Sequence, residues 1–436
     1  MILTVFGILL VLVLLITWAK IHPFIAFLIV SILAALLLGV NPAQIGGSVQ
    51  KGVGDILGPV FSVIILGSML GKIIASSGAA QQISESLVTL FGQKNLAYAL
   101  ALTGFIVGIP LFYNVGFILL IPLIYSLGQR FQLPLVYLAV ALCSALSVTH
   151  GFLPPHPSPT AIVPMMNASL GQTLIYGLIA SVPVIFLAGP LFAKTVRNIQ
   201  GSPLASLKVK IFEKAEMPSA GISFFCALLP VVLLALGTWF TSLFEKSSQA
   251  YKISSLLADA NIVMLLSLLV AYYFLGMRRG NTLGKVMQEG IESTKDVFPI
   301  LMIIAGAGVL KEILISAGIS TQIADIMKTS SFSPLVTGWF IAAVIRLSLG
   351  SATVAGLTAA GLIAQGFDPA VVNPNLMVLS IGAGSLMFSH VNDTGFWMFK
   401  EYFNLNIRDT IKSWSLMETV VSFAGLIMVL IMDIFV

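Results

Sequence analysis

Charged side chains are scarce in this chain. Only 9% of its 436 residues are Asp, Glu, Lys or Arg, whereas 58% are hydrophobic. Soluble domains carry roughly 25% charged residues, so this composition excludes a chain that folds in water. The apolar residues gather in runs such as 2–18 and 23–40, which approach the roughly 17–25 residues that a membrane helix needs. We therefore predict an all-α polytopic membrane protein that lies in a lipid bilayer.

Cysteine is nearly absent, and the basic residues form no cluster. Cys143 and Cys226 both lie inside apolar runs, as small core residues do, so we predict neither a disulfide nor a metal site. The net charge is +5, but no basic stripe alternates with aromatic residues. That excludes nucleic acid as a partner, and no cofactor is predicted. The first apolar run lacks a basic leader and is followed by Lys20 and a second run, so we interpret it as a retained helix rather than a signal peptide.

The chain is predicted to contain the same fold unit twice. The most polar long stretch, 194–221, divides the sequence almost in half, and similar apolar segments follow in the same order on either side. Gly-Ser-Met-Leu-Gly-Lys at 67–72 matches Gly-Ala-Gly-Val-Leu-Lys at 306–311, and His150 matches His390 at an offset of 240 residues. We predict a first transmembrane repeat at 1–193, a cytoplasmic linker at 194–221 and a second repeat at 222–436.

Each half contains a pair of short apolar segments with glycine or proline between them. The pairs are 96–110 with 115–127, and 335–349 with 352–364. At about 1.5 Å per residue such arms reach only about 21 Å, short of the roughly 30 Å hydrocarbon core. They predict re-entrant hairpins, so each repeat has five crossings and one hairpin. An odd number of crossings inverts the second repeat, an architecture that recurs in transporters.

Lysine and arginine placement predicts the orientation, because basic residues favour cytoplasmic loops. With the N-terminus outside, fifteen basic residues fall in inner loops and four in outer loops. Both termini are then predicted outside and the linker inside. The outer four are Lys51, Lys246, Lys252 and Lys328; the inner fifteen are Lys20, Lys94, Arg130, Lys194, Arg197, Lys208, Lys210, Lys214, Arg278, Arg279, Lys285, Lys295, Lys400, Arg408 and Lys412.

Two apolar segments are predicted to break at mid-membrane. The first break, at 147–160, has four prolines in a stretch of six residues, which a regular helix cannot contain. The second, at 389–395, has His390, Asn392 and Asp393 instead. Backbone groups freed at a break are available to a polar substrate. Broken helices survive at that depth only when they are buried in protein or line a wet cavity.

The two breaks contain three of the four histidines of the chain, together with Asp393. A charge at the bilayer centre costs at least about 2.5–3.5 kcal/mol on insertion scales, so Asp393 is expected to be paired or neutral part of the time. Histidine has an unperturbed pKa near 6.5 and changes charge readily. Asp393, His390, His150 and His156 are the predicted proton-coupling residues. The alternative is that these histidines only bind unwound backbone.

The hairpin tips, 108–116 and 346–353, carry further polar groups. The second arm of each hairpin begins at its tip with free N–H groups and the positive end of its dipole, which suits an anion. Arg346 adds a fixed cation that can bind a carboxylate through two hydrogen bonds; a structural ion pair is its alternative role. The predicted substrate-binding residues are Arg346, Asn114, Tyr113, Thr149, His150, Ser348, Ser351, Thr353 and Asn392.

Two motifs of soluble enzymes are set aside. His390 and Asp393 could form half of a metal site, but the sequence offers no third ligand at suitable spacing. Ser147, His150 and Asp393 could form a catalytic triad on paper, but no nucleophile-elbow motif accompanies them. We predict that the protein is not an enzyme.

Three motifs resemble the gluconate:proton symporter family. They are Ala-Leu-Ser-Val-Thr-His-Gly-Phe-Leu-Pro-Pro-His-Pro-Ser-Pro-Thr-Ala at 145–161, Leu-Gly-Ser-Ala-Thr-Val-Ala at 349–355, and Phe-Ser-His-Val-Asn-Asp-Thr-Gly-Phe-Trp-Met-Phe-Lys-Glu-Tyr-Phe at 388–403. The resemblance covers nearly the whole chain. It implies uptake of gluconate or a related sugar acid with protons through a bacterial inner membrane. It also implies membership of the wider ion-transporter superfamily, which is typically dimeric.

One residue departs from the family pattern. Similar members often carry an acidic residue at the first hairpin tip, where this chain has Asn114. If that acid carries the proton in relatives, coupling here must use Asp393 or a histidine, or be altered. Relatives also handle idonate, fructuronate or D-serine, and the motifs look closer to the gluconate branch than to the D-serine branch. Sodium-coupled carboxylate transport on the same fold is the alternative function.

Overall fold

All the regular secondary structure in the described part of the chain is helical. The computed structural model describes residues 2–204, 212–318, 333–364, 366, 369 and 371–436. The helices of the first half are α1 (Ile2–Thr17), α2 (Pro23–Leu37), α3 (Pro42–Ser76), α4 (Ala79–Phe91), α5 (Leu96–Gly108), α6 (Tyr113–Phe131), α7 (Leu135–Phe152), α8 (Pro157–Met165) and α9 (Leu170–Phe186). Those of the second half are α10 (Ala220–Leu243), α11 (Gln249–Leu257), α12 (Ala260–Ala271), α13 (Leu283–Ser316), α15 (Pro334–Leu349), α16 (Ala352–Ile363), α17 (Pro374–Gly384), α18 (Thr394–Tyr402), α19 (Ile407–Thr410) and α20 (Leu416–Asp433).

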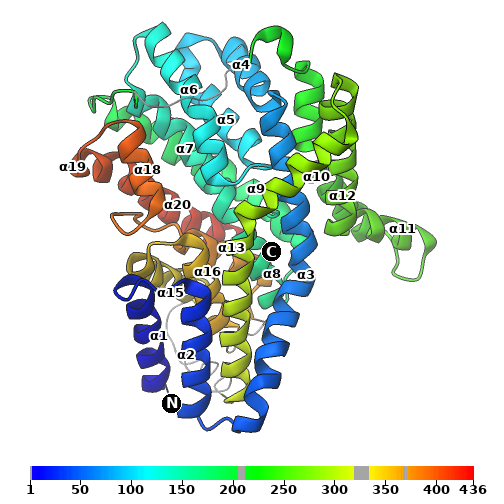
Figure 1. Ribbon diagram of the computed structural model, residues 1–436, viewed down its shortest axis with the longest axis vertical. Helices are drawn as coiled ribbons and strands as arrows, with labels where there is room; N and C mark the ends of the chain where they lie inside the picture. The colour runs from blue at the N-terminus through cyan, green and yellow to red at the C-terminus, as the bar shows by residue number, and fades with distance from the viewer. Residues whose placement is uncertain (1, 205–211, 319–332, 365, 367–368, 370) are drawn as a thin grey trace.

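Two long helices, α3 and α13, run side by side along the molecule (Figure 1). Near the start of α3, Ser48 Oγ lies 3.2 Å from Ser316 Oγ at the end of α13. Near the end of α3, Ser76 Oγ donates to Glu289 Oε2 at 3.0 Å, close to the start of α13. The contacts therefore run in opposite directions along the two helices, which pack antiparallel. Each helix also contains one internal proline, Pro59 or Pro299, at the offset of 240 residues.

Small residues let the backbones of α3 and α13 approach each other. A Cβ added to Gly52 would lie 2.6 Å from the carbonyl oxygen of Gly308, which no real side chain tolerates. The buried hydroxyl of Ser68 donates to the Ser293 carbonyl at 2.8 Å. Close packing of this kind takes the place of the hydrophobic effect between helices in lipid. The α3–α13 pair thus forms a rigid support for the elements around it.

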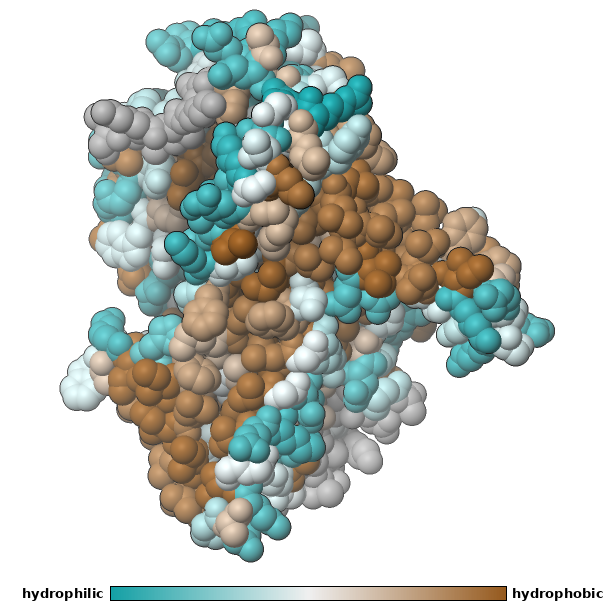
Figure 2. Space-filling model, turned by 45° about the vertical axis from the view of Figure 1, so that its right-hand side comes forward, coloured by the Kyte–Doolittle hydropathy of each residue, from teal (hydrophilic) through white to brown (hydrophobic). Residues whose placement is uncertain are grey.

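The length and surface of the helices show that this is a polytopic membrane protein. Among the described residues, eight helical segments are long and apolar enough to cross a bilayer. Large hydrophobic side chains are exposed on α10 and α12, including Phe225, Trp239 and Leu269. Figure 2 shows the continuous apolar surface over this region, with hydrophilic surface beyond it. Exposure of this extent in water would be an aggregation liability, whereas lipid accepts it.

The segments predicted as hairpin arms are helices, and the chain leaves helical structure at both predicted breaks. Helices α5 and α6 are joined at 109–112, and α15 and α16 at Gly350 and Ser351. Helix α7 ends before α8, and α17 ends before α18, at the two predicted breaks. One arm differs in length: α6 has 19 residues, because its helix continues through Pro122 to a left-handed cap at Gln132. Its length alone therefore does not require it to be re-entrant.

Some sequence predictions fall on residues outside the described ranges. These are part of the predicted linker (205–211), and the basic residues Lys208, Lys210 and Lys328 of the orientation count. Some described helices, among them α4, α11 and α18, were not predicted from the sequence. Helix α11 projects from the side of the molecule beside α12 (Figure 1). It has only nine residues with mixed polarity, too few for a membrane segment to be recognised.

Candidate functional site

The elements interrupted in each half meet around one cavity. It measures about 280 Å³ and is lined by the tips of both hairpins, by the break before α18, and by α7 and α20. Ile300, at the middle of α13, also lines it, so the cavity lies at mid-length of the supporting pair. Its lining residues are Phe112, Tyr113, Asn114, Ser147, His150, Ile300, Arg346, Leu349, Gly350, Ser351, Ala352, Thr353, Leu386, Asn392, Asp393, Thr394, Gly395, Trp414 and Glu418.

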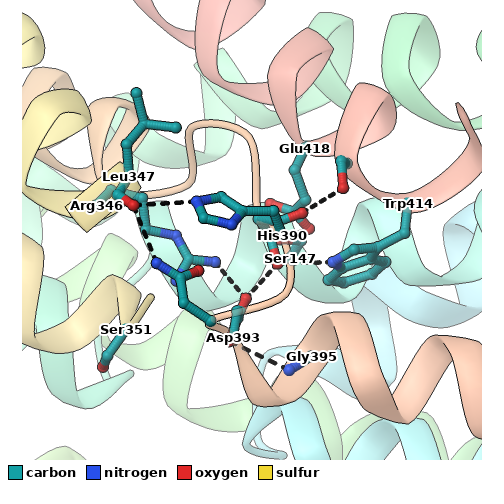
Figure 3. A network of polar contacts seen from close by, with 12 residues as sticks. Ser147, Arg346, Leu347, Ser351, His390, Asp393, Gly395, Trp414 and Glu418 are labelled. Carbon is teal, nitrogen blue, oxygen red and sulfur yellow. Dashed lines mark hydrogen bonds and ion pairs between the residues drawn. The ribbon is translucent and has the colours of Figure 1, made fainter. Parts of the chain in front are cut away.

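Arg346 supplies the fixed cation of the cavity. It lies in the last turn of α15 and is only 3% exposed. Its Nη2 forms an ion pair with Oδ2 of Asp393 (Figure 3). Its Nε and Nη1 find no hydrogen-bond partner among the described residues. Unsatisfied buried donors on a cation are costly, so this guanidinium retains capacity for a second anion.

Asp393 is held as the partner of Arg346 by three donors. Besides the guanidinium, the hydroxyl of Ser389 donates to Oδ2, and the backbone N–H of Gly395 donates to Oδ1 at 3.2 Å. The Ser389 hydroxyl in turn accepts from Trp414 Nε1 at 2.7 Å. Asp393 is also the N-cap residue of α18, where a carboxylate interacts favourably with the helix dipole. The alternative role considered for Arg346, an ion pair, is therefore present.

Three helix N-termini face this cavity. The first residues of α6, α16 and α18 all contribute to its lining. Gly350 adopts a φ of +75°, and a Cβ there would clash with the carbonyl oxygen of Asn392. The second hairpin tip thus contacts the break before α18 closely. Helix N-termini carry partial positive charge, which adds to that of Arg346.

Glu418 is the site residue that sequence reasoning missed. It lies in the first turn of α20, is 1% exposed and lines the cavity. Ser147 Oγ of α7 donates to its Oε1 at 2.6 Å, whereas its Oε2 has no partner among the described residues. Figure 3 shows it on the side of the cavity away from Ser351. The available signal was a carboxyl four residues into the last apolar segment, 414–436, far from the other acidic residue of that segment, Asp433.

Two further polar groups in the cavity lack partners. His150 Nδ1 and the Tyr113 hydroxyl are buried and find no nitrogen or oxygen partner among the described residues. Their rings lie 6.4 Å apart edge to face. Together with Arg346 and Glu418, they give the cavity donors and acceptors that the described residues leave without a nitrogen or oxygen partner. Buried polar groups in native structures are nearly always paired with protein, water or ligand.

The structure brings together most of the predicted site residues. Asn114, Tyr113, His150, Arg346, Ser351, Thr353, Asn392 and Asp393 all line the cavity. The other four do not line it. Thr149 Oγ1 donates to the Leu146 carbonyl at 2.9 Å, and Ser348 Oγ donates to the Val344 carbonyl at 3.0 Å.

The other two histidines predicted for proton coupling bind main-chain carbonyls. His156 Nε2 lies 2.8 Å from the Gly108 oxygen, and His390 Nε2 lies 3.0 Å from the Leu347 oxygen. These contacts match part of the alternative we considered for the histidines: both bind backbone, but the two carbonyls belong to the last turns of α5 and α15 and not to unwound segments. His156 is buried behind His150, with ring centroids 5.5 Å apart. His390 bridges the loop before α18 to α15 (Figure 3).

A second cavity of about 440 Å³ adjoins the first, and Phe112 lines both. Its lining includes Lys72 of α3 and Asp296 of α13. Phe212, in the segment between the two halves, also lines it. The backbone N–H of Phe212 donates to the Gln81 side chain at 2.9 Å. The second cavity therefore lies beside Phe212 and the start of α4, where Gln81 is located.

The chemistry of the first cavity suits a small hydroxylated anion. It has one guanidinium with free donors, three helix N-termini, and hydroxyl, amide and imidazole groups around them. Ligand pockets of this type combine a few placed polar groups with an apolar wall. The residues described in this structure contain no cluster of three or more His, Cys, Asp or Glu side chains that could hold a metal ion.

Comparison with known proteins agrees with these features. Residues 1–435 match the family model described as GntP family permease. The chain is 41% identical to a high-affinity gluconate transporter of Escherichia coli, over 98% of each chain, and 41% identical to a gluconate permease of Bacillus subtilis, over 95% of each. It is 38% identical to the Gnt-II system L-idonate transporter of Escherichia coli, over 97% of each.

Two solved structures have a similar fold at low sequence identity. The YdaH transporter of Alcanivorax borkumensis matches with a TM-score of 0.69 at 14% identity, over 95% of this chain and 99% of that one. MtrF of Neisseria gonorrhoeae matches with a TM-score of 0.68 at 14% identity, over 97% of each. The family resemblance found in the three motifs is thus confirmed over the full length, and the chain belongs to the GntP family of permeases, which are transporters rather than enzymes.

Proposed function

We propose that this protein imports gluconate or a closely related sugar acid, such as idonate, together with protons across a bacterial cell membrane. The names of its relatives supply the substrate class. The observation that carries the proposal is Arg346, a buried cation in the cavity whose Nε and Nη1 have no partner among the described residues. A sugar-acid carboxylate matches the charge and planar geometry of this group.

The remaining lining groups suit the hydroxyls of the substrate. Asn114, Tyr113, His150, Ser351, Thr353 and Asn392 surround the space beside Arg346 and offer both donors and acceptors. Thr149 and Ser348, which we also predicted as binding residues, satisfy backbone carbonyls outside the lining instead. The cavity of about 280 Å³ is near the lower end of the roughly 300–1,000 Å³ typical of ligand pockets. That size favours a small substrate.

Co-transport of a proton lowers the cost of carrying the anion. A single charge at mid-membrane is expensive, whereas a proton and a carboxylate together bring no net charge. Of the proton-coupling residues predicted from the sequence, Asp393 and His150 line the cavity. His390 and His156 bind backbone oxygens, which supports structural roles for both. The proton is therefore expected to bind to a titratable group that lines the cavity.

We also propose the inverted-repeat architecture, with repeats at 1–193 and 222–436 around a cytoplasmic linker at 194–221. Each repeat has five crossings and one re-entrant hairpin. Three observations support it: α3 and α13 occupy equivalent positions and pack antiparallel, Pro59 and Pro299 are equivalent, and both hairpin tips line one cavity. A two-fold axis in the membrane plane relates such repeats.

The same proposal places both termini outside. The central segment contacts the structure near the end of α3, where Arg279 Nη1 also donates to the Ser77 carbonyl. The opposite end of α3 has the Lys51–Glu312 ion pair. A basic end beside the central segment supports a cytoplasmic position for the linker. Assembly as a homodimer is part of the proposal through the superfamily resemblance.

The test is uptake of labelled gluconate by proteoliposomes, with an imposed inward proton gradient and choline in place of sodium. The proposal expects accumulation that a protonophore abolishes, with competition by idonate and not by D-serine. Accumulation only when sodium is present would replace proton coupling with sodium coupling. Competition by D-serine alone would contradict the substrate class. No accumulation with either ion, in vesicles shown to be sealed, would contradict active transport of gluconate.

A further inference from the structure

We propose that Glu418 holds the transported proton, and that Asp393 remains ionised as the partner of Arg346. This inference rests on the proposed function and assigns a residue that was absent from the sequence-based predictions. It differs from the expectation that Asp393 or a histidine carries the proton. It depends on how the two carboxyl groups of one cavity are surrounded.

The surroundings of Asp393 suit a carboxylate. Both of its oxygens accept hydrogen bonds, and one of the donors is the Arg346 guanidinium. Hydrogen bonds to the charged form and a neighbouring opposite charge both favour ionisation. Protonation of Asp393 would forfeit an ion pair and leave the 3% exposed guanidinium uncompensated, which is strongly unfavourable for a buried cation. The ion pair that joins the second hairpin to the break before α18 therefore depends on the Asp393 carboxylate.

The surroundings of Glu418 suit a carboxylic acid. It is 1% exposed and accepts one hydrogen bond, from Ser147, while its Oε2 has no partner among the described residues. The nearby cation, Arg346, is already neutralised by Asp393. An ionised Glu418 would thus be a second buried negative charge without a cation of its own. The protonated form avoids that cost and leaves a donor to offer.

None of the other titratable groups described around Glu418 provides a positive charge that could pair with its carboxylate. The titratable groups that lie near Glu418 or line the same cavity are Tyr113 of α6, Cys143 and His150 of α7, and Asp393 before α18. Tyrosine and cysteine become negative when they lose a proton, and Asp393 is already negative. His150 Nδ1 has no partner among the described residues, so it is not fixed as a cation by a carboxylate. Arg346 remains the cation for three possible anions: Asp393, Glu418 and the substrate.

This charge balance couples the proton to the sugar acid. With Glu418 protonated, the substrate carboxylate can bind Nε and Nη1 of Arg346, and the Oε2–H of Glu418 can donate to a substrate oxygen. When Glu418 gives its proton to water on the low-proton side, its new carboxylate repels the bound anion, which leaves. An empty carrier then contains one cation and two carboxylates. Both the loading and the release steps follow from one titrating group.

The experiment compares Glu418→Gln with the parent protein in two assays. Glutamine keeps the size of the side chain and can still pair with Ser147, but it cannot release a proton. We expect exchange of labelled for unlabelled gluconate at equal pH to remain measurable, because exchange requires no net proton release, but to be slower than in the parent, because the substitution changes a side chain that contacts the substrate. Uptake driven by a gradient of one pH unit, worth about tenfold accumulation per proton, should fall to equilibration without accumulation. Accumulation by Glu418→Gln equal to that of the parent would overturn the inference.

Two further variants separate this result from other causes of failure. Glu418→Asp keeps a titratable carboxyl and is expected to retain gluconate accumulation with a shifted pH profile. If Glu418→Asp lost accumulation but kept exchange, as Glu418→Gln is expected to do, the proposal that Glu418 binds and releases the proton would be contradicted. If Glu418→Gln is not monodisperse in size-exclusion chromatography, Glu418→Asp is compared with the parent instead. A pH profile of gluconate accumulation equal to that of the parent would then overturn the inference. Asp393→Asn is expected to lose exchange as well as accumulation. Absence of gradient-driven uptake by the parent protein would instead contradict the proposed function.

Discussion

Arg346 and Asp393 form an ion pair that uses only one of the three guanidinium nitrogens of the arginine. The pair joins the second hairpin to the break before α18, two elements that are 47 residues apart in sequence. It also leaves Nε and Nη1 without partners among the described residues, inside a cavity with room for a small anion. One side chain therefore stabilises the site and retains the capacity to bind substrate.

Replacement of Arg346 by lysine should weaken substrate binding more than it weakens the fold. Lysine keeps the charge that Asp393 requires but loses the planar fork and its additional donors. A hydrogen bond to a charged group contributes about 1.5–3 kcal/mol, so the apparent KM for gluconate should rise about tenfold to hundredfold. Initial uptake rates over a range of gluconate concentrations measure this. A KM equal to that of the parent would show that the carboxylate binds elsewhere.

The ion pair should behave as a unit in stability measurements. Arg346→Gln or Asp393→Asn alone leaves a buried charge unpaired, at a cost of about 3–5 kcal/mol. The double variant removes both charges and should recover most of that loss, which a double-mutant cycle detects. Thermal unfolding in detergent provides the comparison. Additive effects of the two substitutions would contradict a direct pair.

Much of this site could be predicted from the sequence because its residues lie at breaks in apolar segments. Arg346, Asn114 and Asp393 were identified by polarity where a membrane helix should be uniform, and all three line the cavity. Glu418 lies in a segment without proline or a neighbouring polar motif, so only the folded structure shows that it meets Ser147 across 271 residues. Side-chain partners of that separation cannot be deduced from local patterns.

The repeat pattern overstated the similarity of His150 and His390. They are equivalent at the offset of 240 residues, but α7 continues through His150, whereas α17 ends at Gly384 before His390. One ring consequently lines the cavity, and the other binds the Leu347 carbonyl. An internal repeat predicts where an element lies, but its local backbone still depends on the residues of each copy. The re-entrant depth of the hairpins is likewise a property of the bilayer, which sequence length alone does not determine.

His390→Gln is accordingly expected to transport almost normally. Glutamine can donate to the Leu347 carbonyl that His390 Nε2 contacts at 3.0 Å, so the loop before α18 keeps its attachment. The pH dependence of gluconate uptake should match that of the parent, because no coupled proton is lost. His150→Gln is the informative comparison, since that ring lines the cavity. A flattened pH profile in His390→Gln would return that histidine to the coupling mechanism.

Gly350→Ala should abolish transport through backbone geometry. Gly350 has a φ of +75°, and an added Cβ would clash with the Asn392 carbonyl, so the hairpin tip and the break before α18 would separate. Gly39→Ala is a matched control, because Gly39 has a φ of +79° with nothing within 4 Å of an added Cβ. Both substitutions carry similar strain, and only the first should lose gluconate uptake at equal protein content. Equal activity of the two variants would contradict a close tip contact as a requirement for transport.

Gluconate-driven proton movement tests the central claim most directly. Gluconate is added to weakly buffered, sodium-free proteoliposomes with the membrane potential clamped, and the external pH is recorded. Symport predicts that the medium becomes alkaline as gluconate enters, that a protonophore dissipates the change, and that Arg346→Gln vesicles give none. Entry of labelled gluconate with no alkalinisation, or alkalinisation that requires sodium, would contradict proton-coupled transport through this cavity.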